Sequence, residues 1–238
     1  MEEVFRGTTI GNYKLISFIG RGGMGEVYKA QHIHLENLAA IKILIKGEET
    51  DIRTVQSFLR EAQAAAMIKH ENVVQVYDIG ETPSYWYIIM EFVSGADCAQ
   101  LLRRFEKIPV FDCVRLAKDA ARGLQAIHAH HLIHRDIKPH NLFITHKMIT
   151  KVGDFGLVRY QDTVENMSTK LAGTPAYMSP EQLISVKEVN ATSDVYSLGA
   201  TLYHLVTGKQ IYAGKTFHEI LMALGIGSPF PSPREILP

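Results

Sequence analysis

The feature that most constrains the fold is a change of sequence pattern near Gly95. Before it, short runs rich in β-branched and aromatic residues are separated by glycines and polar residues, which is typical of antiparallel strands. These strand-like runs cover residues 15–19, 26–30, 39–45, 72–79 and 85–92. After it, apolar residues recur at helical spacing over long stretches. We therefore expect a small β-rich half followed by a larger helical half.

The first half also contains one predicted helix. Between residues 57 and 68, Phe58, Ala62 and Ala65 recur every three or four positions, which places them on one helix face. A hinge between the halves would be a natural place for a ligand-binding cleft. The expected parts are an N-terminal extension at 1–12, a β-rich lobe at 13–92, a hinge at 93–97 and a mainly helical lobe at 98–238.

The composition restricts the classes of function. The 238 residues are 46% hydrophobic, enough for a sizeable core, and 25 Lys and Arg balance 25 Asp and Glu. Without net positive charge there is no overall footprint for nucleic acid, so function must come from local sites. Cys98 and Cys113 show no C-x-x-C spacing, so packed thiols in a reducing compartment are expected rather than disulfides or a zinc site.

Neither a targeting segment nor a membrane span is evident in the sequence. The N-terminus carries Glu2 and Glu3 instead of an apolar segment, and no run approaches the roughly 18 apolar residues that a membrane span needs. We therefore expect no signal peptide, no membrane span in this chain and a cytoplasmic location.

A glycine-rich segment lies between the first two strand-like runs. Its glycines are Gly20, Gly22, Gly23 and Gly25. A backbone without side chains can approach phosphate groups closely and offer them N–H donors. A simple glycine-rich hairpin turn is the alternative, and the motif alone does not decide between them. A dinucleotide-binding fingerprint would continue into a helix, whereas a strand follows here, which favours a lid over phosphates.

Lys42 lies in the middle of an apolar strand-like run, on the face that it shares with Ala40 and Leu44. On the following helix, Glu61 stands three residues after Phe58 and would turn toward the apolar face. An ion pair between Lys42 and Glu61 would satisfy both groups and leave the ammonium near the phosphates of a nucleotide. The alternative is that each side chain reaches water along its aliphatic stem.

The most specific motif is L-I-H-R-D-I-K-P-H-N-L-F at residues 132–143, followed by G-D-F-G at 153–156. It lies downstream of the glycine-rich segment and Lys42, and a chance occurrence of this series is negligible. From about Tyr13 to its last residues, the chain therefore resembles the protein kinase family. The resemblance implies a two-lobed α+β kinase fold and transfer of the γ-phosphoryl group of ATP to a protein hydroxyl.

The resemblance assigns roles to the residues of this motif. Asp136 would orient the substrate hydroxyl or accept its proton, and Lys138 would stabilise charge on the transferred phosphoryl group. Asn141 and Asp154 would supply oxygen ligands to Mg²⁺, or to Mn²⁺ in its place.

The resemblance also implies where ATP binds. The Lys42 ammonium, paired with Glu61, would contact the α- and β-phosphates beneath the glycine-rich segment. A Phe is less usual than Leu or Met at the floor of the adenine site. Residues expected around the adenine and its hinge are Ile19, Val27, Ala40, Met90, Glu91, Val93 and Phe143.

Further features resemble the serine/threonine-specific branch, and most of all bacterial kinases of the eukaryotic-like (Hanks) type. Lys138 is followed by a proline, and G-T-P-A-Y at 173–177 places Thr174 in the family's substrate-docking loop. Both features disfavour tyrosine specificity. Ser179 replaces the Ala of the family's A-P-E motif, a small-for-small change.

Arg135 beside Asp136 resembles kinases that are switched on by phosphorylation of the segment 154–181, because arginine can grip a phosphate bidentately. Ser168 and Thr169 are the expected sites, and autophosphorylation there would involve a homodimer. The alternative is that both hydroxyls are ordinary loop residues.

The resemblance departs from the family pattern near the end. Too few residues follow Asp194 for the last helices of the large lobe, so a C-terminally incomplete lobe is expected. Glu181 would then lack its usual arginine partner. Asp194 would tie the catalytic loop from below, or simply begin a helix. His128, His130 and His131 are expected to end an exposed helix rather than bind a metal.

Two other functions must be distinguished from a protein kinase. An inactive kinase-like scaffold is the main alternative because of the incomplete lobe, although Lys42, Asp136 and Asp154 are all present. A small-molecule phosphotransferase of related fold, such as an aminoglycoside kinase, would lack the docking segment at 173–181.

Overall fold

The computed structural model describes residues 5–22, 25–47, 52–154, 159–160, 175–184, 186–214, 217–225 and 231–236. The chain divides into two compact units. Unit 1 consists of Met1–Lys69 and Val74–Ser94, and unit 2 consists of His70–Val73 and Gly95–Pro238.

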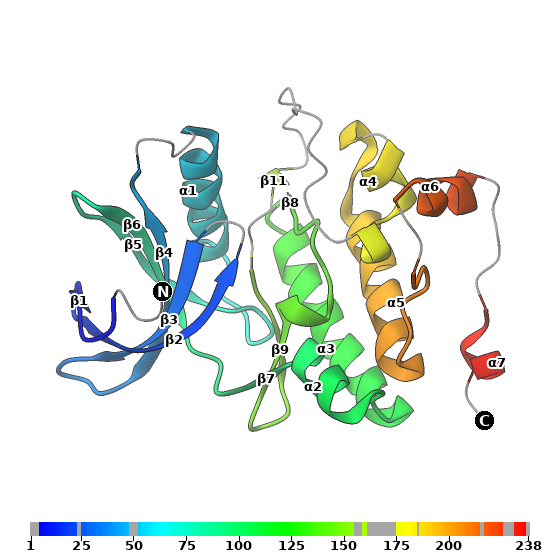
Figure 1. Cartoon of the computed structure of the whole chain (residues 1–238), viewed down its shortest axis with the longest axis horizontal. Helices are drawn as coiled ribbons and strands as arrows, with labels where there is room; N and C mark the ends of the chain where they lie inside the picture. Colours follow the sequence, from blue (N-terminus) through cyan, green and yellow to red (C-terminus); the bar gives the residue numbers. More distant parts are fainter. Residues whose placement is uncertain are drawn as a thin grey trace. The chain divides into compact units, whose positions relative to one another are not determined.

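Unit 1 is built on a six-stranded antiparallel sheet together with helix α1 (Figure 1). The strand order is β1-β2-β3-β4-β6-β5, so β6 lies between β4 and β5. The elements are β1 (Thr9–Ile10), β2 (Tyr13–Gly22), β3 (Gly25–His32), β4 (Leu38–Ile45), α1 (Ile52–Ala66), β5 (Val76–Glu81) and β6 (Tyr85–Glu91).

The two faces of this sheet bury different cores. Residues opposite one another on neighbouring strands share a face, and side chains alternate between the faces along each strand. One face carries a core that includes Tyr28 and Ile41. On the other face, Leu44 and Ile88 pack against Phe58 of α1. The interior of β4 is therefore buried on both faces, which explains its nearly continuous apolar sequence.

Unit 2 is mainly helical. Its described helices are α2 (Cys98–Phe105), α3 (Val110–His128), α4 (Pro180–Ile184), α5 (Ala191–Thr207), α6 (Phe217–Gly225) and α7 (Pro233–Ile236). Its strands are β7 (Gly95–Asp97), β8 (Leu132–Ile133), β9 (Leu142–Thr145), β10 (Thr150–Val152) and β11 (Arg159–Tyr160). The 3₁₀ turns are η1 (Pro139–Asn141), η2 (Pro175–Tyr177) and η3 (Val186–Glu188). β9 pairs with both β7 and β10, and β8 pairs with β11.

Helices α3 and α5 pack side by side at the centre of unit 2 (Figure 1). α3 turns a buried stripe toward the core, which includes Leu116 and Ala120 at helical spacing. α5 begins at a capping box formed by Asn190 and Ser193, and it ends at Gly208 in the left-handed conformation. Both ends of α5 are thus fixed by the local sequence. Within the described ranges, no helix is both long and apolar enough to cross a bilayer.

The short segment His70–Val73 leaves unit 1 and joins unit 2. The carbonyl of Asn72 accepts a hydrogen bond from the N–H of Val152 at 2.8 Å, and its side-chain amide donates to the carbonyl of Thr150 at 2.9 Å. The segment also lies against α3, where a Cβ added to Gly123 would be 2.4 Å from the Asn72 carbonyl oxygen. This close approach requires a glycine in the middle of α3.

The predicted α+β fold, with strands before helices, is confirmed. The strands expected at 15–19, 26–30, 39–45 and 85–92 are present, and α1 starts earlier than the helix expected at 57–68. The strand expected at 72–79 is partly wrong, because β5 begins at Val76 and residues 72–73 bond to β10 instead. Of the expected hinge at 93–97, Gly95–Asp97 form β7, which pairs with β9 in unit 2.

Cys98 and Cys113 are buried free thiols, as predicted. Burial raises the pKa of Cys98 to about 12 and the pKa of Cys113 to about 11. Both thiols therefore stay protonated and poorly reactive at neutral pH.

We predict that Gly123→Ala destabilises the chain by about 1–3 kcal/mol, because the new methyl group would overlap the Asn72 carbonyl. Gly199→Ala is the matched control: Gly199 also lies in a helix, but nothing lies within 4 Å of an added Cβ. That change should stabilise the chain by about 0.5–1 kcal/mol. Urea unfolding of the three proteins measures both effects, and similar shifts for the two variants would contradict the proposed packing of His70–Val73 on α3.

Candidate functional site

The sheet face that packs against α1 also carries residues predicted to contact the nucleotide. Val27 pairs with Lys42, and Ala40 pairs with Met90, while Ala40 and Lys42 are two residues apart on β4. These four side chains therefore lie on one face. Lys42 is only 7% exposed, which is unusual for a lysine and means that its ammonium needs polar partners.

Glu61 belongs to α1, the helix that covers this face. Its neighbours Phe58 and Ala62 are buried against Leu44 and Ile88. The side chain of Glu61 itself lies outside the described part of the structure. The ion pair between Lys42 and Glu61 therefore stays a prediction.

β2 and β3 form a hairpin whose tip carries the glycine-rich segment. Gly22 pairs with Gly25 across the hairpin, and Gly23 lies outside the described residues. Gly25 has a φ of 134°, and a Cβ there would lie 2.1 Å from the carbonyl oxygen of Ile43 on β4. Gly20 borders open space instead. A glycine is thus sterically required at 25, whereas at 20 it leaves the backbone accessible.

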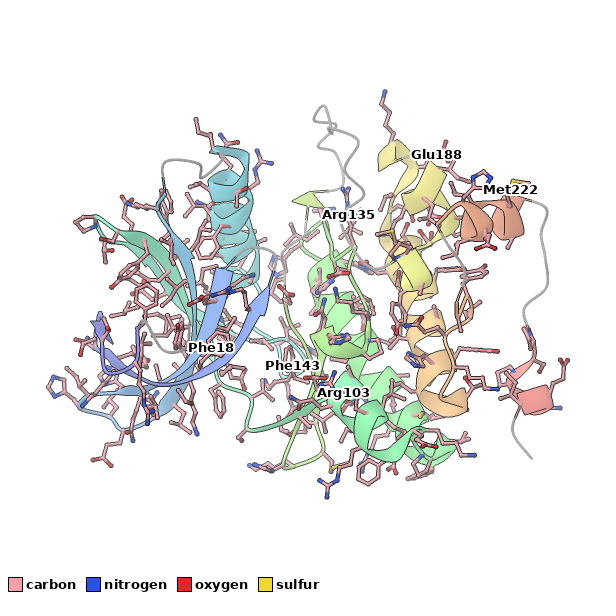
Figure 2. All side chains as sticks on the ribbon, in the orientation of Figure 1. Phe18, Arg103, Arg135, Phe143, Glu188 and Met222 are labelled. Carbon is pink, nitrogen blue, oxygen red and sulfur yellow. The ribbon has the colours of Figure 1, made fainter. Side chains whose placement is uncertain are left out.

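The other predicted adenine contacts are divided between the units. Ile19 on β2 is half exposed, and Val93 follows β6 and is half-buried. Glu91 ends β6, where its N–H donates to the carbonyl of Gln75 at 2.8 Å. Phe143 lies on β9 of unit 2 and is half-buried (Figure 2).

The loop between β8 and η1 is organised by Asp194 from the first turn of α5. The Asp194 carboxylate is fully buried and accepts hydrogen bonds from the N–H groups of His134 at 2.9 Å and Arg135 at 2.8 Å. Nε2 of His128 donates to the same carboxylate at 2.8 Å. The N-terminus of α5 adds a favourable dipole. The expectation that Asp194 ties down the catalytic loop is therefore confirmed.

The His134 ring connects two parts of the site. Its Nδ1 accepts a hydrogen bond from the N–H of Asp136 at 3.3 Å. The proton of a neutral ring must therefore be on Nε2, which donates to the carbonyl of Gly153 at 3.1 Å. This fully buried ring links the backbone at Asp136 with the residue that precedes Asp154.

Asp136, Lys138 and Asn141 form one hydrogen-bonded cluster. Nζ of Lys138 donates to Oδ2 of Asp136 at 2.8 Å, and Nδ2 of Asn141 donates to the same oxygen at 3.0 Å and to the Asp136 carbonyl at 2.7 Å. The side chains of Asp136 and Lys138 are only 13% and 18% exposed. The structure thus brings these three side chains together, and the catalytic and metal-binding roles expected for them stay predictions.

The β9–β10 hairpin brings Asn141 and Asp154 to one end of a sheet. Leu142 pairs with Val152, and the N–H of Gly153 donates to the carbonyl of Asn141 at 3.0 Å. Because the Asn141 amide nitrogen is engaged by Asp136, its amide oxygen remains to accept. An amide oxygen and an exposed carboxylate are hard ligands, which fits a divalent cation such as Mg²⁺.

Several residues singled out in the sequence lie outside the described part of the structure. They are Ser168, Thr169 and Thr174. The roles expected for them therefore stay predictions.

Two residues that position the loop were missed in the sequence. His128 was expected on an exposed helix end, which is wrong, because its imidazole is only 20% exposed and bonds to Asp194. Gln182 on α4 donates to the Arg135 carbonyl at 2.7 Å and accepts from the N–H of Ser179 at 3.0 Å. The contacts of His128 with Asp194 and of Gln182 with Arg135 join residues more than 45 positions apart, so no local pattern could reveal them.

The sequence matches the protein kinase domain over residues 13–227. The chain belongs to the protein kinase family.

Curated bacterial proteins similar to this kinase domain carry related names. A probable serine/threonine-protein kinase of Clostridium acetobutylicum is 37% identical over 212 residues, which are 88% of this chain and 32% of that protein. The kinase PknA of Corynebacterium glutamicum is 37% identical over 89% of this chain and 46% of its own length. PrkC of Bacillus subtilis is 34% identical over 87% of this chain and 32% of its own length. The chain thus spans about a third to a half of these relatives.

In this kinase domain Glu181 has a partner other than the arginine expected from the family. The Ser193 hydroxyl donates a hydrogen bond to its carboxylate. Burial acts to raise the pKa of Glu181, but the hydrogen bonds, foremost that from Ser193, outweigh it and hold the pKa below its usual value. The ionised carboxylate is therefore stabilised in the folded state.

This shift predicts a pH dependence of stability. Because the folded-state pKa of Glu181 is lowered, its contribution is present above the unfolded-state pKa and is lost as pH falls through the folded-state pKa, which lies on the acid side of the usual Glu value. Replacing Glu181 by Gln should remove this part of the pH dependence of the unfolding free energy.

The control is Glu188→Gln, at an exposed position labelled in Figure 2. Urea unfolding at pH 7, 5 and 3.5 provides the comparison. The parent should lose more unfolding free energy on acidification than Glu181→Gln does, and Glu188→Gln should lose as much as the parent. Parallel curves for all three proteins would argue against the stabilised carboxylate.

Proposed function

We propose that this kinase domain transfers the γ-phosphoryl group of ATP to serine or threonine hydroxyls of proteins, including itself. The observation that carries the proposal is the cluster of Asp136, Lys138 and Asn141, supported from below by Asp194. Phosphoryl transfer depends mainly on positioning and charge stabilisation, and this cluster offers both.

Asp136 would orient the attacking hydroxyl. Hydrogen bonds from Lys138 and Asn141 engage its Oδ2. In the transfer, the substrate oxygen bonds to the γ-phosphorus while the bond from that phosphorus to the β,γ-bridging oxygen breaks, ADP leaves, and the hydroxyl proton passes to Asp136. The Lys138 ammonium, 2.8 Å from Asp136, would stabilise the negative charge of the phosphoryl oxygens.

Asn141 and Asp154 would hold the divalent cation that protein kinases use, which we propose to be Mg²⁺, with Mn²⁺ able to replace it. When bound, this cation neutralises charge on the phosphate oxygens. The hairpin register of β9 and β10 supports the assignment, since it brings the two ligand positions to the same end of that sheet.

We propose contacts to ATP for each unit by itself. In unit 1 these are the glycines of the β2–β3 hairpin, Lys42 with Glu61 for the α- and β-phosphates, and an adenine site on the α1 face. The adenine residues would be Ile19, Val27, Ala40, Met90, the hinge backbone at Glu91 and Val93, and Phe143 of unit 2. The shared face of Val27, Ala40, Lys42 and Met90 supports this arrangement. Dependence on ATP is consistent with a cytoplasmic site of action.

The choice of serine and threonine rests on Lys138 and on the expected docking role of Thr174. The names of the relatives from Clostridium, Corynebacterium and Bacillus support it. We further propose autophosphorylation at Ser168 or Thr169 within a homodimer, with Arg135 as the phosphate partner.

Asp136→Asn tests this proposal. The substitution keeps the shape of the side chain but removes the proton acceptor, so phosphate transfer from [γ-³²P]ATP and Mg²⁺ to protein substrates should fall about 10²- to 10⁴-fold. Asp112→Asn, at a partly exposed position on α3, is the control and should retain activity.

Phosphoamino-acid analysis of the labelled products should find phosphoserine and phosphothreonine. Equal transfer by the parent and Asp136→Asn would contradict the catalytic assignment. A folded parent without transfer to any substrate would instead favour an inactive scaffold, and labelled tyrosine would overturn the proposed specificity.

A further inference from the structure

A cavity of about 670 Å³ opens on unit 2 between segments that are distant in sequence. One wall is formed by α2 and the residues after it, another by the end of α5 and residues 207–210, and a third by Pro139 and His140, while Tyr177 of η2 and Ile236 of α7 also line it. Buried residues among these include Leu102, Pro139 and Tyr177. The volume is in the range of ligand-binding pockets in general.

The walls of this cavity are firmly connected. The N–H of Ile108 donates to the carbonyl of Leu205 at 2.8 Å, which joins the segment after α2 to α5. Gly208 has a φ of 73°, and an added Cβ there would lie 2.6 Å from the Glu106 carbonyl oxygen. The two walls therefore contact each other through their backbones, and the cavity is preformed.

The lining of the cavity has an excess of positive charge. Among the described lining residues, Arg103, Lys107 and Lys209 stand against one carboxylate, that of Glu106. Each of these four side chains is exposed, and Arg103 is labelled on α2 in Figure 2. Since the whole chain has balanced formal charges, this excess is a local property. An anionic ligand is therefore favoured here over a cationic one.

The cavity adjoins the catalytic cluster through His140, which follows Lys138 by two residues. Pro139 and His140, which line the cavity, form the turn η1 together with Asn141 of that cluster. The turn also contacts α2, which carries Arg103. The wall of the cavity is therefore continuous with the segment that carries Lys138 and Asn141.

Tyr177, His204 and Gln210, which also line the cavity, form a hydrogen-bonded group. The Tyr177 hydroxyl lies 2.7 Å from Nδ1 of His204 and accepts a hydrogen bond from Nε2 of Gln210 at 3.3 Å. Burial, and then the nearby His140, lower the pKa of His204 and keep its ring neutral at neutral pH. In the tautomer that carries its proton on Nε2, Nδ1 accepts the hydrogen bond from the Tyr177 hydroxyl. At neutral pH the formal positive charge of the cavity comes from its Arg and Lys side chains.

We propose that this cavity binds acidic side chains of the protein substrate, so that the kinase favours hydroxyls flanked by Asp or Glu. Free anions are a poorer match, because the cationic groups are spread over two walls of a large cavity, as a peptide with several carboxylates would require. The inference rests on the proposed function for its catalytic consequence, but the binding site can be tested without catalysis.

The first test measures binding by fluorescence anisotropy. Two labelled peptides share one serine, flanked by Glu in one and by Gln in the other. The Glu peptide should bind about three- to twentyfold more tightly at low salt, as expected for two or three exposed ion pairs, and the difference should shrink at high salt. Arg103→Gln with Lys209→Gln should remove the preference.

The matched control is Arg104→Gln with Lys118→Gln, which removes the same charge. Arg104 shares the last turn of α2 with Arg103, and neither control residue lines the cavity. The control should keep the preference for the Glu peptide. Equal binding of both peptides to the parent, or equal loss in both double variants, would overturn the inference whether or not the chain is active.

Phosphorylation of the same peptides separates this inference from the proposed function. The Arg103/Lys209 double variant should raise KM for the Glu peptide about three- to twentyfold and leave kcat and the Gln peptide nearly unchanged. Efficient phosphorylation of both peptides with equal KM would overturn the inference and leave the kinase assignment intact. Tight, selective binding of the Glu peptide without phosphate transfer would support the binding site and contradict the proposed kinase activity.

Discussion

The buried carboxylate of Asp194 is the interaction on which the catalytic part of this protein depends. Burying a charge without partners is costly, and a carboxylate can be accommodated only where several donors converge on it. Two backbone N–H groups, the His128 imidazole and the N-terminus of α5 provide this environment. In return, the carboxylate holds Arg135 at a φ of 66°, a backbone conformation that non-glycine residues rarely adopt. Asp194 thus stabilises a strained loop that would otherwise relax.

The position of the reacting groups follows from that loop. Asp136 directly follows Arg135 in the sequence. The His134 ring bonds to the backbone N–H of Asp136 through Nδ1 and to the carbonyl of Gly153 through Nε2. Lys138 and Asn141 then converge on one oxygen of Asp136. The same segment continues to His140, which lines the cavity that carries Arg103, Lys107 and Lys209. Catalytic geometry and the proposed choice of substrate therefore depend on one folded loop.

Much of this could be predicted from the sequence, because the kinase motif is local and specific. Strand alternation was enough to place Lys42 on the same face as Ala40. The residues that we propose as catalytic were assigned from the order of the motifs along the chain. Where a residue's role is set by its immediate neighbours or by a family pattern, the sequence was informative.

The remaining features depend on contacts between distant segments. The hydrogen bond between His128 and Asp194 joins α3 to α5, and the periodicity of the sequence did not predict it. Ser193 donates a hydrogen bond to Glu181 while also capping α5, a double role that neither contact alone suggests. The cavity is lined from several segments that are distant in sequence, so its charge could not be seen in a balanced overall composition.

The most direct test of this account is residue-resolved hydrogen exchange of the His134 and Arg135 amides, followed by NMR in the parent and in Asp194→Asn. In the parent both amides should be protected. In the variant, loss of charge-assisted hydrogen bonds should speed their exchange by roughly 10- to 100-fold, while amides of β3 and β4 in unit 1 keep their protection. Unchanged protection of His134 and Arg135 in Asp194→Asn would contradict the claim that this carboxylate holds the catalytic loop.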